Sequence, residues 1–213
     1  MAAIDPYTPA STGYDTSYLQ CGSPAPSGSA FGIVGVNAGR PFSSNSCLAA
    51  EYAAAPQSPA PSLYINTGYS GAYRKNITAA CSASSGSING TSGQRQAWAI
   101  GCSEAETSLN HAGPVAVSAW WLDVETANSW SSSNLTLNQY TIQGGVSRLL
   151  QASPNVGVYS TASMWTTITG GSFTPSGLAA DWVAGGTCST PFTGSPVWLT
   201  QSTAGGFDSD TAC

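Results

Sequence analysis

The chain has 213 residues, of which 41% are hydrophobic and only 7% are charged, and its formal net charge at pH 7 is -5. This length and hydrophobic content predict one domain over residues 1–213, with residues 1–12 as an extended N-terminal segment. The five basic residues are scattered, so no basic patch neutralises phosphates, and we expect no nucleic-acid partner.

Eight short runs rich in β-branched and aromatic residues follow one another along the chain, separated by helical patterns or by Gly-, Ser- and Pro-rich loops. The runs span residues 13–20, 31–37, 62–68, 117–126, 155–161, 181–186, 197–203 and 206–210. Helices are predicted over 46–55, 96–113 and 135–152, although glycines 144 and 145 weaken the last of these patterns. The connections after residue 155 carry few helical signals. We therefore predict an α/β fold, an irregular TIM-like barrel with about eight strands and fewer helices toward the C-terminus.

Side chains two residues apart on a strand point to the same face, and each run separates an aliphatic face from a polar or aromatic one. In AWWLDVET, Leu122 and Val124 share one face, while Asp123 and Glu125 share the other with Trp121. In a closed barrel the aliphatic face contacts the outer helices and the other face points to the barrel axis. The two acids are therefore predicted to lie inside the barrel, near the carboxyl ends of its strands.

Paired carboxylates in such a place suit glycoside hydrolysis, in which one acid donates a proton and another stabilises positive charge on the sugar. Glu125 is the candidate general acid because it lies nearer the barrel mouth. Burial and the neighbouring charge of Asp123 should raise one pKa and keep that acid protonated. The separation of the carboxyl groups, and with it a retaining or an inverting outcome, depends on side-chain rotamers and stays open.

Four segments occur in a characteristic order: GYDTSYLQCG at 13–22, WWLDVE at 120–125, VGVYSTASMW at 156–165 and VWLTQSTAGGFDSD at 197–210. In this order they resemble the motifs of glycoside hydrolase family 25, the Chalaropsis-type lysozymes, over nearly the whole chain from about residue 13. The resemblance implies an irregular barrel of eight strands and about five helices. It also implies a muramidase, which cleaves the bond after N-acetylmuramic acid in peptidoglycan.

The resemblance assigns roles to particular residues. Glu125 would be the general acid and Asp123 its partner carboxylate, which orients the substrate N-acetyl group or stabilises the intermediate. Asp15 would complete the acidic cluster together with an aspartate of the last strand. Asp208 and Asp210 share a face there, and we place Asp208 in the catalytic set and Asp210 in the substrate-binding set without deciding which one matches the family.

Sugar binding is expected from aromatic rings, which stack on pyranose C–H surfaces, and from amides, which bind hydroxyl groups. Tyr159 and Trp182 are the leading cleft candidates. The other candidates are Tyr64, Trp165, Trp198, Asn37, Asn66 and Gln201. No cofactor or metal is expected, because one histidine and no CxxC pair leave little basis for a zinc site.

Six cysteines in a chain with little Lys are typical of a secreted, disulfide-bonded protein. They allow 15 pairings, and the sequence does not choose among them. Three sequons, at Asn76, Asn89 and Asn134, agree with an extracellular location. No apolar run reaches the roughly 18 residues of a membrane span, and MAAIDPYTP lacks the regions of a signal peptide. We expect a monomer.

Alternatives remain at the level of substrate and activity. The segments GVNAGRPF at 35–42 and LTQST at 199–203, and the Ser- and Gly-rich stretch 82–95, depart from the family pattern. They leave open a glycosidase acting on another polysaccharide, such as chitin or an arabinogalactan-type wall glycan, and a barrel that binds sugar without cleaving it. A Ser-His-Asp hydrolase would need His111 as its base, and the sequence has no GxSxG elbow.

Overall fold

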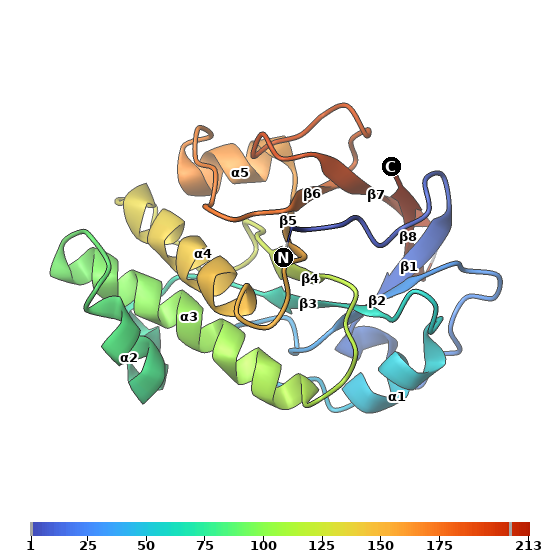
Figure 1. Ribbon diagram of the computed structural model, residues 1–213, viewed down its shortest axis with the longest axis horizontal. Coiled ribbons are helices and arrows are strands. Elements are labelled where there is room, and N and C mark those ends of the chain that lie inside the picture. Colours follow the sequence, from blue (N-terminus) through green and yellow to red (C-terminus); the bar gives the residue numbers. More distant parts are fainter. Residues whose placement is uncertain (1, 205) are drawn as a thin grey trace.

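The structure, a computed structural model, describes residues 2–204 and 206–213. Eight strands close into a barrel in sequence order (Figure 1). Neighbours from β1 to β7 are parallel, while β8 runs antiparallel to both β7 and β1. The strands are β1 (Thr12–Thr16), β2 (Gly32–Gly35), β3 (Ser62–Asn66), β4 (Trp120–Asp123), β5 (Val156–Ser160), β6 (Ala180–Ala184), β7 (Val197–Ala204) and β8 (Phe207–Ala212). Each strand overlaps one of the eight predicted runs, so the prediction of an irregular TIM-like barrel is confirmed.

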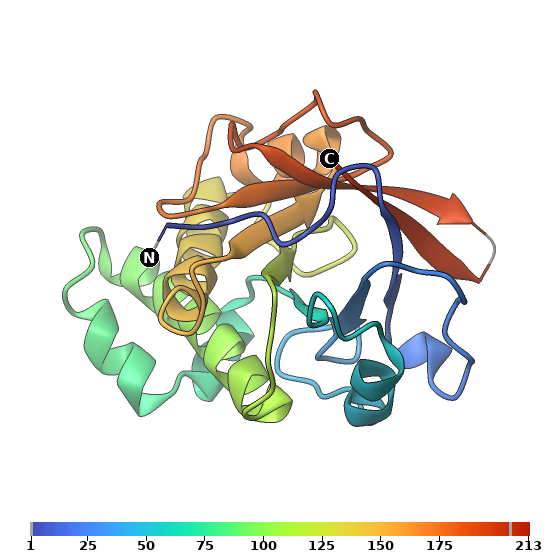
Figure 2. The same cartoon turned by 45° about the vertical axis from the view of Figure 1, so that its right-hand side comes forward.

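Helices gather on one side of this barrel (Figures 1 and 2). The α-helices are α1 (Leu48–Ala54), α2 (Ala79–Ser85), α3 (Ser92–Ala112), α4 (Leu135–Leu149) and α5 (Ala162–Thr169), and the 3-10 helices are η1 (Tyr18–Gln20) and η2 (Gly71–Asn76). The three predicted helices correspond to α1, α3 and α4. Helices do thin out toward the C-terminus, because none follows β6 in the part of the chain that the structure describes.

Two of the α-helices, α2 and α5, have no counterpart in the sequence prediction. The α5 segment is rich in threonine, which is poor in helix propensity, but its threonine hydroxyls bond to carbonyls four residues back. Thr161 caps its start and Gly170, in the left-handed region, ends it. The α2 helix begins at Ala79, just before the Ser- and Gly-rich stretch 82–95, and continues into it; Thr78 caps its N-terminus, and a disulfide ties Cys81 to Cys102 of α3.

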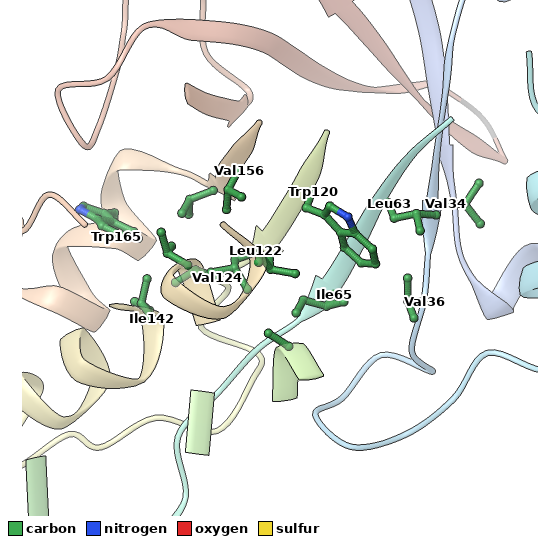
Figure 3. Close-up of a cluster of buried hydrophobic side chains, with 14 of the residues drawn as sticks. Val34, Val36, Leu63, Ile65, Trp120, Leu122, Val124, Ile142, Val156 and Trp165 are labelled. Atoms are coloured by element: carbon green, nitrogen blue, oxygen red, sulfur yellow. The ribbon is translucent and has the colours of Figure 1, made fainter. Parts of the chain in front are cut away.

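The aliphatic faces of the strands pack against the helices, as the two-residue alternation predicts. One buried cluster joins Val34, Leu63, Leu122 and Val156 of the strands to Ile142 of α4 (Figure 3). The opposite faces form a second, aromatic cluster inside the barrel. Each central strand is therefore buried on both sides, which explains its continuous apolar sequence.

The N-terminal segment helps to close the amino end of the barrel. Tyr7 is buried there, and its hydroxyl shares a hydrogen bond of 2.6 Å with Ser62 Oγ at the start of β3. Trp121 Nε1 donates to the same hydroxyl at 3.1 Å, and Phe31 packs on the ring at 4.8 Å between centroids. With this end filled, the carboxyl ends of the parallel strands are the place for a cleft.

Three disulfides connect Cys21 to Cys47, Cys81 to Cys102, and Cys188 to Cys213. No helix in residues 2–204 and 206–213 is long and apolar enough to cross a membrane. Over the same residues, no group of three His, Cys, Asp or Glu side chains has an arrangement that could hold a metal ion.

Candidate active site

A cleft of about 470 Å³ lies at the carboxyl ends of the parallel strands. It is lined by polar, acidic and aromatic side chains from strands that are far apart in the sequence. Nine of the thirteen candidate residues line it: Asp15, Tyr64, Asn66, Asp123, Glu125, Tyr159, Trp182, Gln201 and Asp208. The barrel closure brings these residues together, because parallel strands place their carboxyl ends at one rim.

Strand register places the four acids of the cleft. Asp15 of β1 is directly paired with Asp208 of β8, and Asp123 at the end of β4 is paired with Asn66 of β3 and Tyr159 of β5. Glu125 follows two residues after Asp123, beyond the end of the strand, and is half-buried. Asp123 is only 5% exposed. The two acids therefore differ in depth although they share a face.

Asp123 is held by one neighbour. Its Oδ2 accepts a hydrogen bond from Asn66 Nδ2, while among the described residues no donor reaches its Oδ1. Burial raises the pKa of Asp123 well above its usual value, and the negative charges of Glu125 and Asp15 raise it further. This carboxyl is thus buried beside other acids, and its Oδ1 has no hydrogen-bond partner among the described residues.

The loop after β4 fixes the backbone of Glu125. Trp130 Nε1 and the backbone N–H of Asn128 both donate to the backbone carbonyl of Glu125, at 2.7 Å and 3.1 Å. Burial raises the pKa of the Glu125 carboxyl, and the nearby charge of Asp208 raises it further. A carboxylic acid that keeps its proton at higher pH and faces a cleft is suited to general acid catalysis.

Asp15 belongs to a hydrogen-bonded chain across the cleft floor. Gln201 Nε2 donates to Asp15 Oδ2 at 2.8 Å, and the Tyr159 hydroxyl donates to Gln201 Oε1 at 2.7 Å. Burial, opposed by the Gln201 bond and reinforced by the charge of Asp208, raises the pKa of Asp15 to about 7. Tyr159 therefore orients the Gln201 amide, and that amide orients the Asp15 carboxyl.

Asn37 and Asp210 are two of the four candidate residues that do not line the cleft. Asn37 is buried, and its side-chain amide bonds to the backbone N–H and C=O of Asn66, which joins the carboxyl ends of β2 and β3. Asp210 is also buried, and its Oδ1 accepts a hydrogen bond from Trp182 Nε1 at 2.9 Å. Neither side chain is placed to contact a molecule in the cleft.

Aromatic rings form the inner wall of the cleft. Tyr159 packs edge-on against Trp182 at 4.6 Å between ring centroids, and Tyr64 also packs edge-on against Trp182, at 6.2 Å. The other two aromatic candidates lie in the core: Trp165 packs outside the barrel against Phe173, and Trp198 packs inside it against Trp121. The prediction that these two rings line a sugar cleft is wrong.

Sequence reasoning missed the outer rim of the cleft. Tyr18 and Leu19 of η1 line it and are 39% and 73% exposed. Ser17 and Gln20, which match a family motif, form the capping box of η1 and so turn the chain out of β1. The signal available was this Ser-x-x-Gln pattern, which marks a helix start inside a run interpreted as strand.

His111 lies in a different hollow, of about 370 Å³, between α1 and the end of α3. Leu48, Tyr52 and Leu63 give this hollow a mainly apolar lining, and no acid of residues 2–204 and 206–213 lines it. The histidine is therefore separated from the four acids of the cleft, and a Ser-His-Asp arrangement finds no support here.

Comparison with known proteins places this barrel and its cleft in context. The family model described as Lysozyme-like protein 1 matches residues 74–182, which are 109 of the 213 residues. No match was found among curated proteins.

Solved structures share the fold along almost the whole chain. The muramidase from Trichobolus zukalii is 18% identical, with a TM-score of 0.63 over 96% of this chain and 94% of that one. The family GH25 lysozyme from Aspergillus fumigatus is 13% identical, with a TM-score of 0.62 over 95% and 94%. The lysozyme from Streptomyces coelicolor is 19% identical, with a TM-score of 0.57 over 97% and 93%. The fold is thus the barrel of family 25 lysozymes, and by its family model the chain belongs to the family of Lysozyme-like protein 1.

Proposed function

We propose that the protein is a secreted muramidase, a glycoside hydrolase that cleaves the N-acetylmuramic acid linkage of peptidoglycan with Glu125 as the general acid. The observation that carries this proposal is the meeting of Glu125, Asp123, Asp15 and Asp208 in one cleft. The cleft also holds the aromatic and amide groups that a sugar chain requires. Membership of a lysozyme-like family agrees with it.

The chemistry follows from the different environments of the two acids on β4. Glu125, whose pKa is raised by burial and by the charge of Asp208, acts in its protonated form and donates that proton to the glycosidic oxygen as the bond to the anomeric carbon breaks. Positive charge then develops on the sugar ring. Asp123, held by Asn66, stabilises this charge directly or through the N-acetyl group of the substrate. The Glu125 carboxylate finally accepts a proton from the attacking water.

The rest of the cleft binds the sugar. The faces of Tyr159 and Trp182 offer apolar surface to the pyranose ring, while Gln201 and Asn128 offer amides to its hydroxyl and N-acetyl groups. Among the residues that the structure describes, no Lys or Arg lines the cleft. The acidic stem peptides of peptidoglycan therefore find no charge partner inside it, and recognition rests on the neutral glycan strand.

Secretion is supported by the covalent structure. Disulfide bonds persist in oxidising compartments and are rare in the cytosol. This chain contains three of them. A cell-wall glycan is also an extracellular substrate, so location and proposed activity agree.

The proposal is tested by incubating purified peptidoglycan with the wild type and with Glu125→Gln, and by measuring the released reducing ends and identifying them by mass spectrometry. The wild type is expected to yield fragments that end in N-acetylmuramic acid. Removing the proton donor is expected to lower the rate by about 10²–10⁴-fold.

Glu106→Gln is the matched control, because it makes the same Glu-to-Gln substitution on α3, outside the cleft lining. There Glu106 pairs with Arg148 at 3.6 Å. This variant should retain wild-type activity. Equal activity of the wild type and Glu125→Gln would contradict the assignment of the acid. The wild type is also incubated with other polysaccharides. Products from one of these, but none from peptidoglycan, would contradict the proposed substrate.

A further inference from the structure

Asp210 is a buried carboxyl group that the reaction scheme above does not use. It lies on β8, paired with Gly13 of β1 and Gln201 of β7, and its side chain has no exposed surface. Its Oδ1 accepts from Trp182 Nε1 at 2.9 Å. Its Oδ2 is buried, and no N–H or hydroxyl group of the described residues donates to it.

The acid beside Asp210 on the neighbouring strand is Asp15. Gly13 of β1 is the register partner of Asp210, and Asp15 lies two residues further along the same face. Gln201, the register partner of Asp210 on β7, donates to Asp15 at 2.8 Å. Two carboxylates cannot hydrogen-bond to each other, since both are acceptors only, so a bond between these two acids requires a proton on one of them. Oδ2 of Asp210, which no described donor reaches, is the oxygen free to carry that proton.

The surroundings favour the neutral form of Asp210. The groups that act on it are Asp15 from β1, Asp208 from its own strand and Trp182 from β6, and none of them is basic. Tyr7, from the N-terminal segment, and Gln201, from β7, complete the neighbourhood without adding positive charge. An ionised carboxylate buried without a counter-ion is costly, so the group retains its proton.

The two acids differ in their hydrogen-bond partners. Burial and the charge of Asp15 raise the pKa of Asp210 well above its usual value. Gln201 donates to Asp15 at 2.8 Å, and a donated bond favours the charged form of a carboxyl group. The pair is therefore most favourable with its proton on Asp210.

We propose that Asp210 is a positioning residue that works in its protonated form, in which its carboxyl O–H donates to Asp15 while Trp182 anchors its other oxygen. This inference rests on the proposed hydrolase function, to which it adds a fixed orientation for Asp15. Asp15 then accepts one hydrogen bond from Gln201 at the cleft floor and a second from Asp210 beneath. A neutral acid supplies this second donor without adding another charge to a cleft that already holds four acids.

The test compares Asp210→Asn with Asp210→Leu in peptidoglycan hydrolysis across a pH series. Asparagine has the shape of a neutral aspartic acid, and it keeps a donor for Asp15 and an acceptor for Trp182. It should preserve kcat to within about threefold, whereas leucine, which has no donor, should lower kcat by about tenfold or more with little change in KM. A loss in Asp210→Asn equal to that in Asp210→Leu, or full activity in Asp210→Leu, would overturn the proposal.

A second measurement stays decisive if the leucine variant fails to fold. In wild-type protein labelled with carbon-13 at the aspartate carboxyl groups, the NMR signal of Asp210 should remain that of a protonated acid from pH 5 through pH 7, and ionisation there would overturn the proposal. If the wild type released no sugar at all, the proposed function would fail, while this spectrum would still decide the state of Asp210.

Asp181 provides a contrasting buried aspartate for the same substitution. Its two oxygens accept bonds from the Phe192 and Thr193 amides and from the Thr193 hydroxyl. Asp181→Asn places an NH2 group against donors and should lower Tm, whereas Asp210→Asn should leave Tm unchanged. Equal losses of Tm in the two variants would argue that Asp210, too, serves only as an acceptor.

Discussion

Glu125 owes its raised pKa to two separable causes, burial and the charge of Asp208. Asp208→Asn removes the charge and leaves the burial, so the ionised form of Glu125 becomes easier to reach. The pKa of Glu125 should fall, and the alkaline limb of the kcat/KM profile should move to lower pH. The pH profiles of kcat/KM on peptidoglycan, measured for the wild type and for Asp208→Asn, check this prediction. The control Glu106→Gln should leave the alkaline limb in place. An unmoved alkaline limb in Asp208→Asn would show that Asp208 does not raise the pKa of Glu125.

At this scale, sequence alternation predicts the side of a residue better than its depth. Asp123 and Glu125 share a face because they are two apart, and the cleft contains both. Asn37 and Asp210 also occupy the polar faces of their strands, yet both are buried in hydrogen bonds. How deeply a side chain is buried depends on the strands that barrel closure places beside it. The sequence of a single strand does not identify those neighbours.

Among the elements, α3 and α4 cross at two glycines. A Cβ built on Gly101 would lie 1.8 Å from the Thr141 carbonyl oxygen, and one on Gly144 would lie 2.0 Å from that of Trp98. Gly144, which weakens the helical pattern of 135–152 in the sequence, is therefore required by close backbone packing, and so is Gly101 of α3. Periodicity within one helix cannot reveal this, because the need arises from the partner helix.

Gly101→Ala and Gly144→Ala should each lower the free energy of unfolding by about 1–3 kcal/mol or more, since backbone atoms have to move apart. Gly93→Ala is the control in the same helix: its Cβ would have no neighbour nearer than 3.9 Å, and alanine favours helix. This variant should be neutral or more stable by up to about 1 kcal/mol. Urea denaturation of the three variants checks the contrast, and a Gly101→Ala protein as stable as Gly93→Ala would contradict the packing argument.

The boundaries of elements were harder to predict than their existence. The first run was expected to continue as a strand to residue 20, but β1 ends at Thr16 and the Ser17 cap starts η1. The turn places Tyr18 and Leu19 on the cleft rim. Caps act over three residues, so a two-residue alternation that continues through them misassigns the end of the strand.

At the scale of the whole molecule, the folding of the barrel determines which cysteines pair, and no local sequence pattern contains this information. Fifteen disulfide pairings were possible, and the three found join segments separated by 26, 21 and 25 residues. The bond from Cys21 to Cys47 ties the end of η1 at the cleft rim to the start of α1. Number and spacing of cysteines could not single out this partner, because proximity is a property of the folded chain.

The buried acids give the whole protein an unusual dependence of stability on pH. Burial raises the pKa values of Asp15, Asp123, Glu104 and Asp210, so the native state holds protons that the unfolded state releases. Their contribution to stability is fully present below the unfolded pKa values, near 4, and is lost as pH rises through the folded ones. The free energy of unfolding should therefore be highest near pH 4–5 and should decrease toward pH 8.

Glu104 isolates one part of this effect away from the cleft. Its carboxyl is buried on α3, where it accepts from the Thr67 hydroxyl, and burial raises its pKa to about 8. Each proton that only the native state holds contributes a slope of about 1.4 kcal/mol per pH unit to the free energy of unfolding.

In Glu104→Gln this proton is absent from both states. The variant should therefore match the stability of the wild type near pH 4.5, lose less stability between pH 5 and pH 8, and be more stable than the wild type at pH 8. Urea denaturation at several pH values measures the slopes. Glu106→Gln, on the same helix but paired with Arg148, should keep the wild-type slope; parallel curves for Glu104→Gln and the wild type would mean that Glu104 does not hold a proton in the folded protein.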